Sequence, residues 1–153
     1  MTIHTFHCTA RFKGGYHGTG IIENKHLKSQ ISIPKEMNGP DIGTNPDEML
    51  MSAAVTCFTI TMSSYFDKNN IPVEVDHVDA TAAISVVKGL QHYDSITYKV
   101  YLESTEKQLD QGMLSKLKRL IEKGEQNCMI TRALKGNVDI IIESIYLDGN
   151  PFK

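Results

Sequence analysis

The first third of the chain alternates between apolar and polar residues and predicts strands. Over residues 6–12 every second residue is apolar, Cys8 among them, which predicts a strand with one buried face. Glycines and a polar stretch divide the following segment into residues 18–22 and 26–33, the pattern of a hairpin. We therefore expect a three-stranded meander, in which Cys8 fills space in the core.

The middle of the chain carries a strong helix start. A loop rich in Pro and Gly, residues 34–44, leads into Asn45, which suits an N-cap, and Pro46, which suits the first helical position. Asp47 begins an acidic pair that complements the positive end of the helix dipole. The helix is predicted to run to about Tyr65. Its apolar residues lie on all sides, as expected for a helix surrounded by other elements.

The second half of the chain predicts a mixture of strands and helices. The expected elements are hairpin strands at 73–87 and 93–104, a helix at 109–123, a short helix from an Asn127 cap to residue 134, and a closing strand at 138–146. The resulting order, βββ-α-ββ-αα-β, segregates strands from helices and indicates the α+β class. With 153 residues, 41% of them hydrophobic, the chain is expected to form one domain over residues 1–153.

Charge and hydropathy limit the partners and the location. Residues 49–66 form an uncharged run of eighteen, the lower limit for a membrane span, but six of them are Ser or Thr and charged residues flank the run. This composition favours a helix buried in protein. Sixteen basic against eighteen acidic residues give a net charge of −2, so no positive field attracts nucleic acid. Because the N-terminus lacks the pattern of a secretory signal, we expect a cytoplasmic protein without membrane or nucleic-acid partners.

Two of the three cysteines occupy positions of chemical interest. Cys57 lies midway along the predicted central helix, where a lone cysteine is ordinarily a small inert hydrophobic residue. Cys128 directly follows the predicted Asn127 cap, where free backbone N–H groups favour a thiolate. No two cysteines have the Cys-x-x-Cys spacing and the six histidines are dispersed, so no metal site is expected.

Several segments of the chain form a specific motif pattern. The central one is Thr-Asn-Pro-Asp-Glu-Met-Leu at 44–50, followed by Ala53-Ala54 and Cys57-Phe58. The others are the early glycine turn at 14–18, the Ile-Pro-Lys-Glu-Met stretch at 33–37, Asn127-Cys128, and Gly-Asn-Val-Asp at 136–139. In these residues and in their order the chain resembles the OsmC/Ohr family, which comprises the osmotically inducible protein C and the organic hydroperoxide resistance proteins. The resemblance spans about residues 9–145.

This resemblance implies an OsmC-like fold, an intertwined homodimer and a two-cysteine peroxidase that acts on organic hydroperoxides in oxidative-stress defence. Cys57 would be the peroxidatic thiolate and Cys128 the resolving thiol, with no metal or organic cofactor. An external dithiol, such as a dihydrolipoyl group on a protein, would restore both thiols. Asp47 takes the place of the family's acidic residue. Ten residues separate it from Cys57, about 15 Å along a helix, so we expect a second chain to bring it to the thiol.

The activating positions differ from the family pattern and leave other functions open. The family acid is Glu, one methylene longer than Asp47, and Tyr16 stands where the organic hydroperoxide resistance proteins have an Arg. In the osmotically inducible branch the Arg falls near Met37, and Lys35 is the nearest cation. The alternative is therefore a non-catalytic small-molecule binder or redox sensor. A Cys-dependent acyl transferase or hydrolase is a third hypothesis, which requires a His base that no sequence neighbour of Cys57 supplies.

Overall fold

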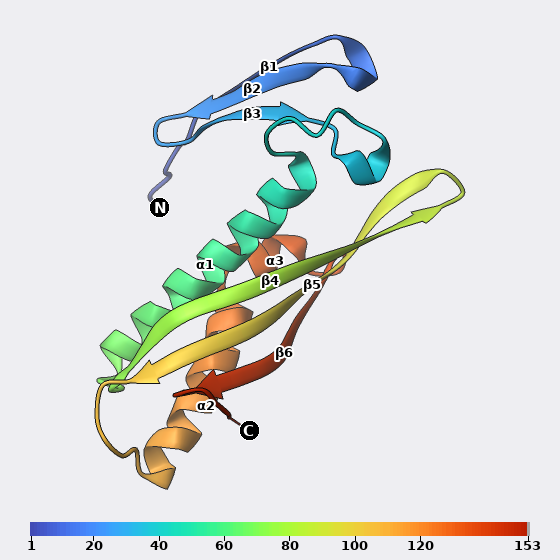
Figure 1. Ribbon diagram of the computed structural model, residues 1–153. Coiled ribbons are helices and arrows are strands. Elements are labelled where there is room, and N and C mark those ends of the chain that lie inside the picture. The colour runs from blue at the N-terminus through green and yellow to red at the C-terminus, as the bar shows by residue number, and fades with distance from the viewer. Residues whose placement is uncertain (153) are drawn as a thin grey trace. The chain divides into compact units, whose positions relative to one another are not determined.

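The computed structural model describes residues 1–152, and the chain divides into two compact units (Figure 1). The first comprises residues 1–49, and the second begins at Leu50. Strands and helices are segregated along the chain, so the predicted α+β class is confirmed. The assignment of residues 1–153 to one domain stays a prediction.

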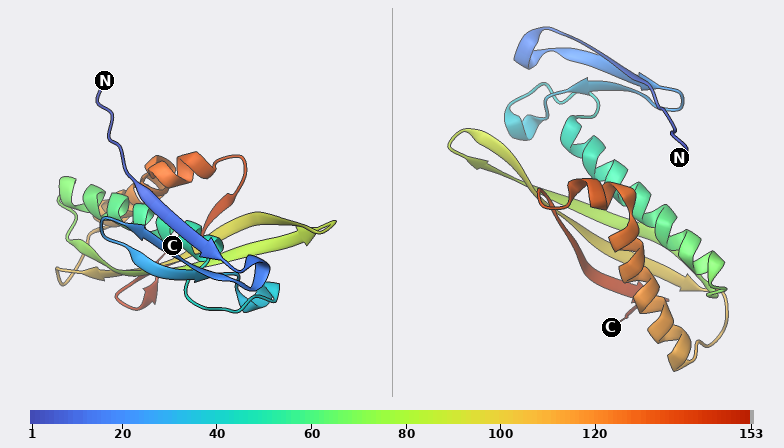
Figure 2. Two further views of the ribbon diagram at one scale, coloured as in Figure 1. Left: turned by 90° about the horizontal axis from the view of Figure 1, so that it is seen from above. Right: turned by 180° about the vertical axis from the view of Figure 1, so that it is seen from behind.

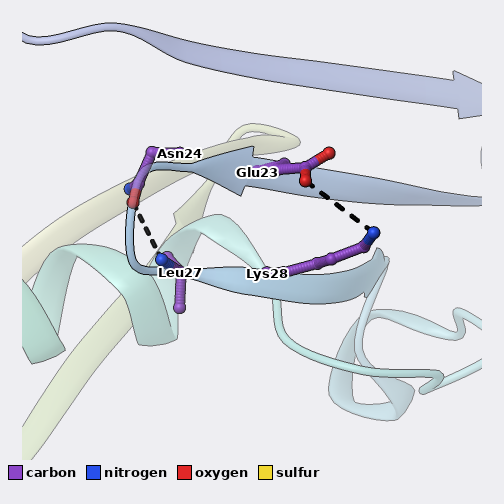
Figure 3. Close-up of polar contacts among 4 residues, drawn as sticks. All are labelled: Glu23, Asn24, Leu27 and Lys28. Atoms are coloured by element: carbon purple, nitrogen blue, oxygen red, sulfur yellow. Dashed lines mark hydrogen bonds and ion pairs between the residues drawn. The ribbon is translucent and has the colours of Figure 1, made fainter.

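The first unit is the predicted meander. Its strands are β1 (Cys8–Lys13), β2 (Thr19–Asn24) and β3 (Lys28–Ser32), which pair antiparallel in the order β1-β2-β3. Short 3-10 helices lie at Gly15–His17 and Lys35–Met37. In the β2–β3 turn the Asn24 side-chain oxygen accepts a hydrogen bond from the Leu27 N–H at 2.9 Å, and Lys28 pairs with Glu23 at 3.7 Å (Figure 3).

No hydrophobic residue of this first unit is buried. All fifteen buried hydrophobic residues lie between Ala54 and Val138, in the second unit. Cys8 is exposed, so the prediction that it fills the core is wrong. The alternation in β1 correctly predicted a strand, but no helix or second sheet of its own unit covers its apolar face.

Helix α1 (Pro46–Lys68) begins at the predicted residue and extends three residues beyond Tyr65. The Asn45 side chain accepts a hydrogen bond from the Glu48 N–H at 3.0 Å, which confirms the predicted N-cap. Among residues 1–152, α1 alone is long and apolar enough to cross a membrane by length and composition. Its buried residues, four apart, belong to the protein core: Ala54, Phe58, Met62 and Phe66.

The second unit contains a four-stranded sheet in the order β4-β5-β6-β7. Its strands are β4 (Val73–Val87), β5 (Leu90–Ser104), β6 (Asp139–Leu147) and β7 (Asn150–Pro151). The long β4–β5 hairpin was predicted, although β5 begins three residues earlier than expected. Strand β6 runs parallel to β5, which requires the crossover connection that the next two helices supply.

Those helices are α2 (Gln111–Asn127) and α3 (Met129–Leu134). Helices α1 and α2 lie on the same face of the sheet (Figures 1 and 2). The strand β5 presents every second residue to this face, and all four are fully or almost fully buried: Ile96, Tyr98, Val100 and Leu102. The core therefore lies between the sheet and the two helices.

Candidate functional site

Helices α1 and α2 run antiparallel and approach closely. The Lys116 ammonium donates a hydrogen bond to the Asn69 carbonyl at 3.2 Å, near the end of α1 and the start of α2. Further along, Gly124 packs against Met62, and a β-carbon placed on Gly124 would lie only 3.3 Å from the Met62 α-carbon. A residue without a side chain is what permits this approach.

This alignment brings two thiols together. Cys57 precedes Met62 by five residues, and Cys128 follows Gly124 by four, so the antiparallel helices place them side by side. Cys128 is fully buried, Cys57 is partly buried, and both are unpaired thiols. A hydrogen bond joins the two side chains. The two cysteines that the sequence identified as the candidate site are thus in direct contact.

The surroundings of Cys57 stabilise a thiolate. Burial raises the pKa of Cys57, but hydrogen bonds outweigh it and the net pKa is lowered. The donors are the Cys128 thiol, the backbone amides of Ile130 and Met129, and the Thr61 hydroxyl. These donors were not predicted from the sequence, in which a cation was the candidate group for stabilising the thiolate. The amides belong to the first turn of α3, whose contact with α1 no local pattern reveals.

The pKa of Cys128 is shifted in the opposite direction, upward. Burial and the hydrogen bond with Cys57 raise the pKa of Cys128, and the Thr131 backbone and side chain only partly oppose this. The expectation of a Cys128 thiolate is therefore wrong. It assumed that Asn127 caps α3, whereas Cys128 itself is the N-cap and Asn127 is the last residue of α2. The Asn127 amide instead donates a hydrogen bond to the Tyr65 hydroxyl at 3.0 Å.

A tyrosine that the sequence analysis did not single out completes the buried surroundings. The Tyr98 ring is fully buried and stacks on Phe58, with centroids 5.0 Å apart and planes 12° apart. Burial, together with the neighbouring Cys128, raises the pKa of the Tyr98 hydroxyl. The position in β5 predicts an inward side chain, but only the fold identifies what its hydroxyl faces.

A cavity of about 470 Å³ is lined by residues from the end of α2, from α3 and from the start of β6. Its lining includes Thr131, which contacts Cys128, and the cations Arg132 and Lys135. Glu125 also lines it, and burial raises the pKa of this carboxyl while Lys135 lowers it.

The other residues named from the sequence belong to the first unit. Asp47 lies in the first turn of α1. The Tyr16 hydroxyl donates a hydrogen bond to the Met37 carbonyl at 2.5 Å, and the Lys35 backbone N–H donates one to Asp41 at 3.4 Å. A role for Asp47 or Lys35 at the thiols stays a prediction.

Comparison with known proteins agrees with the fold and with the cysteine-bearing segment. The family described as OsmC-like protein matches residues 39–143, which include both thiols. An uncharacterized protein of Bacillus subtilis, YmaD, is 38% identical over 152 residues and covers 97% of this chain and 99% of its own. An organic hydroperoxide resistance protein of Xanthomonas axonopodis is 28% identical over 143 residues and covers 92% of this chain and 93% of its own.

Solved structures share the fold. The crystal structure of an organic hydroperoxide resistance protein from Elizabethkingia anophelis gives a TM-score of 0.72 at 20% identity and covers 96% of this chain and 99% of its own. The structure of an OsmC-like protein from Vibrio cholerae gives a TM-score of 0.69 at 17% identity and covers 93% of this chain and 100% of its own. From the matched family and these relatives we conclude that the chain belongs to the OsmC-like family.

Proposed function

We propose that this protein is a cytoplasmic, thiol-dependent hydroperoxide reductase that acts on organic hydroperoxides in oxidative-stress defence. The observation that carries the proposal is the contact between Cys57 and Cys128, in which the pKa of Cys57 is lowered and that of Cys128 is raised. One thiol is thus prepared to act as a nucleophile. The other is held protonated beside it, ready to trap the oxidised sulfur.

The chemistry that this pair would perform needs no metal or organic cofactor. The Cys57 thiolate attacks the terminal peroxide oxygen, the O–O bond breaks, and the departing alkoxide takes up a proton to become an alcohol. Cys57 is then a sulfenic acid. The Cys128 sulfur displaces the hydroxyl group, a disulfide forms and water leaves. An external dithiol, such as a dihydrolipoyl group on a protein, would supply the two electrons that restore both thiols.

Relatives support the choice of substrate class. The Xanthomonas relative and the Elizabethkingia structure are organic hydroperoxide resistance proteins by name. In this chain the partly buried Met51 and Val55 of α1 pack against the hydrophobic core, as Cys57 does. Apolar side chains near a nucleophile favour an alkyl or acyl peroxide over a small polar one.

We further propose that the active protein is a homodimer. A stripe on α1 is exposed although it carries no charge, and it consists of Ala53, Thr56, Ile60 and Ser63. The largest residue of this stripe, Ile60, is 64% exposed. An uncharged helix face of this kind is expected to be covered by another chain. In such a dimer the partner would bring its own Asp47 to the Cys57 thiol, which lies about 15 Å from Asp47 along one helix.

The test is peroxide consumption with dithiothreitol as the reductant. The wild-type protein should consume many equivalents of cumene hydroperoxide, and Cys57→Ser should consume none. Cys8→Ser is the matched control, because Cys8 is exposed in the first unit and has no part in the proposed chemistry. Full turnover by Cys57→Ser would overturn the proposal.

The alternative candidate is a redox sensor or small-molecule binder. It is favoured by Tyr16, which occupies the position of the Arg in the organic hydroperoxide resistance proteins. The same experiment separates the two functions. A sensor would form at most one disulfide per chain and would stop consuming peroxide, whereas a reductase continues until the dithiol is exhausted.

A further inference from the structure

The Tyr98 hydroxyl is a buried donor without a partner. The residue has no exposed surface, and its hydroxyl makes no hydrogen bond to any described residue. Buried hydroxyl groups nearly always have a partner, because an unsatisfied one costs free energy. If the reaction creates a hydrogen-bond acceptor near this hydroxyl, the free-energy cost of the unsatisfied group is removed.

The position of this hydroxyl is fixed by the fold. The Tyr98 ring is stacked on Phe58, the residue directly after Cys57. On the sheet, Tyr98 lies opposite Ala80 of β4 and Ile142 of β6, and the β5–β6 register shifts directly after it. Such irregularities redirect side chains and occur often beside active sites. The ring therefore cannot turn away from the core without breaking its stack.

The two thiols are among the titratable groups whose charge influences the Tyr98 hydroxyl. The charged or titratable neighbours of Tyr98 are Cys128, Glu125, Cys57 and Tyr93, in decreasing order of influence. Burial and these neighbours raise the pKa of Tyr98, so the phenol keeps its proton at physiological pH. The group that most influences it is Cys128, whose own thiol is held protonated.

We propose that Tyr98 is the hydrogen-bond donor that stabilises the Cys128 sulfur as negative charge develops on it during disulfide formation. The inference rests on the proposed function. In the step concerned, Cys128 attacks the sulfur of the Cys57 sulfenic acid, the S–O bond breaks, and the Cys128 proton leaves with the hydroxyl group as water. A buried donor that gains an acceptor as negative charge develops stabilises the transition state of such a step.

The proposal assigns Tyr98 to the second chemical step and not to the first. Cys57 has donors of its own in the Met129 and Ile130 amides and the Thr61 hydroxyl. Removal of the Tyr98 hydroxyl should therefore leave the formation of the sulfenic acid unchanged. Disulfide formation should slow by roughly ten- to a hundredfold, the range for a hydrogen bond to a charged group.

The experiment compares Tyr98→Phe with Tyr101→Phe. Tyr101 lies on the same strand with its ring stacked on His77, away from the core, and so controls for the loss of one tyrosine hydroxyl from β5. Stopped-flow measurement with one equivalent of cumene hydroperoxide gives the rate of each step, and dimedone traps the sulfenic acid. We expect sulfenic acid to accumulate in Tyr98→Phe alone. An unchanged disulfide rate, or equal slowing of both steps, would overturn the proposal.

A second measurement does not depend on peroxide chemistry. In a Cys57→Ser background, the ultraviolet absorbance of the Cys128 thiolate should show a higher apparent pKa after Tyr98→Phe than before it. A purely structural role would not move this pKa. If Tyr98→Phe does not fold, fluorotyrosine incorporated at residue 98 keeps the ring and strengthens the donor, and should speed disulfide formation.

The outcomes separate this inference from the proposed function. If the wild-type protein turns over peroxide and Tyr98→Phe forms its disulfide at the same rate, only the role of Tyr98 is wrong. If the wild-type thiols do not react with peroxide at all, the proposed function fails, and the assignment of Tyr98 fails with it.

Discussion

The two units of the chain differ most in what they bury. Among residues 1–152, every buried hydrophobic residue lies in the second unit, together with the Cys57 and Cys128 pair. The first unit is a three-stranded meander in which no large apolar residue is buried, and some, such as Phe12 and Ile21, are exposed. Three strands need a hydrophobic face packed against something to be stable. The comparison shows that the buried core and the thiol pair belong to the same unit, whereas the meander has no hydrophobic core of its own.

The largest expected difference concerns stability. Phe58→Ala should lower the free energy of unfolding by about 3 to 5 kcal/mol, because Phe58 is fully buried and its loss leaves a cavity beneath Tyr98. Leu27→Ala, at a 45% exposed position of the first unit, should cost no more than about 0.5 kcal/mol. Urea unfolding of the wild type and both variants measures the two losses in unfolding free energy. Equal losses would mean that the first unit also has a core.

The next effect concerns assembly. Ile60→Asp places a charge in the uncharged stripe of α1 and should weaken self-association by about 2 kcal/mol, roughly thirtyfold in the dimer Kd. Ile141→Asp is the control, since Ile141 is also exposed but lies on β6, outside the stripe. Sedimentation equilibrium gives both constants. A wild-type protein that sediments as a folded monomer at micromolar concentration would refute the dimer.

A smaller effect concerns the pKa of the nucleophile. Thr61→Val removes a donor to Cys57 and should raise the pKa of that thiol, so alkylation below the pKa should slow severalfold, equivalent to about 1 kcal/mol. Thr59→Val is the control on the same helix, because the Thr59 hydroxyl donates to the Val55 carbonyl at 2.8 Å. If the pH profile of alkylation is the same in both variants, the Thr61 hydrogen bond does not tune Cys57.

The smallest effect is a pH dependence of stability. Burial raises the pKa of Glu125 above its ordinary value of 4.5, so the folded protein binds this proton more tightly than the unfolded chain. The contribution of Glu125 to stability is therefore greatest at low pH and declines as the pH rises from 4.5 through the raised pKa. Glu125→Gln should have a slightly higher Tm than wild type above this range. If Glu125→Gln and the wild-type protein have the same Tm at every pH, this prediction is contradicted.

Local patterns in the sequence predicted the elements well, and the motif predicted the family. Asn45 and Pro46 fixed the start of α1, and alternation located both hairpins, because these features depend on neighbouring residues. The parallel pairing of β5 with β6 was not predicted, since periodicity carries no information on strand direction. Cys8 was misplaced because alternation indicates an apolar face but not whether anything covers it.

The sequence singled out the two thiols that the structure brings together, but not their electrostatics, and a role for Asp47 stays a prediction. The motif assigned the thiolate to Cys57 and the resolving thiol to Cys128, whereas the expected helix start alone favoured a thiolate at Cys128. The pKa of Cys57 is lowered by amides that reach it from α3, and Cys128 is surrounded by the core. Both facts depend on how α2 and α3 fold back against α1. Tyr98 was missed for the same reason, because its hydroxyl gains meaning only from what surrounds it.

The most direct test of the account is a map of the thiols after one equivalent of cumene hydroperoxide. Reduced protein is treated, alkylated under denaturing conditions, digested and analysed by mass spectrometry. The account predicts a disulfide between Cys57 and Cys128 and an alkylated Cys8. Retention of both core thiols, or a disulfide that includes Cys8, would contradict the claim that the contact between Cys57 and Cys128 is a catalytic pair.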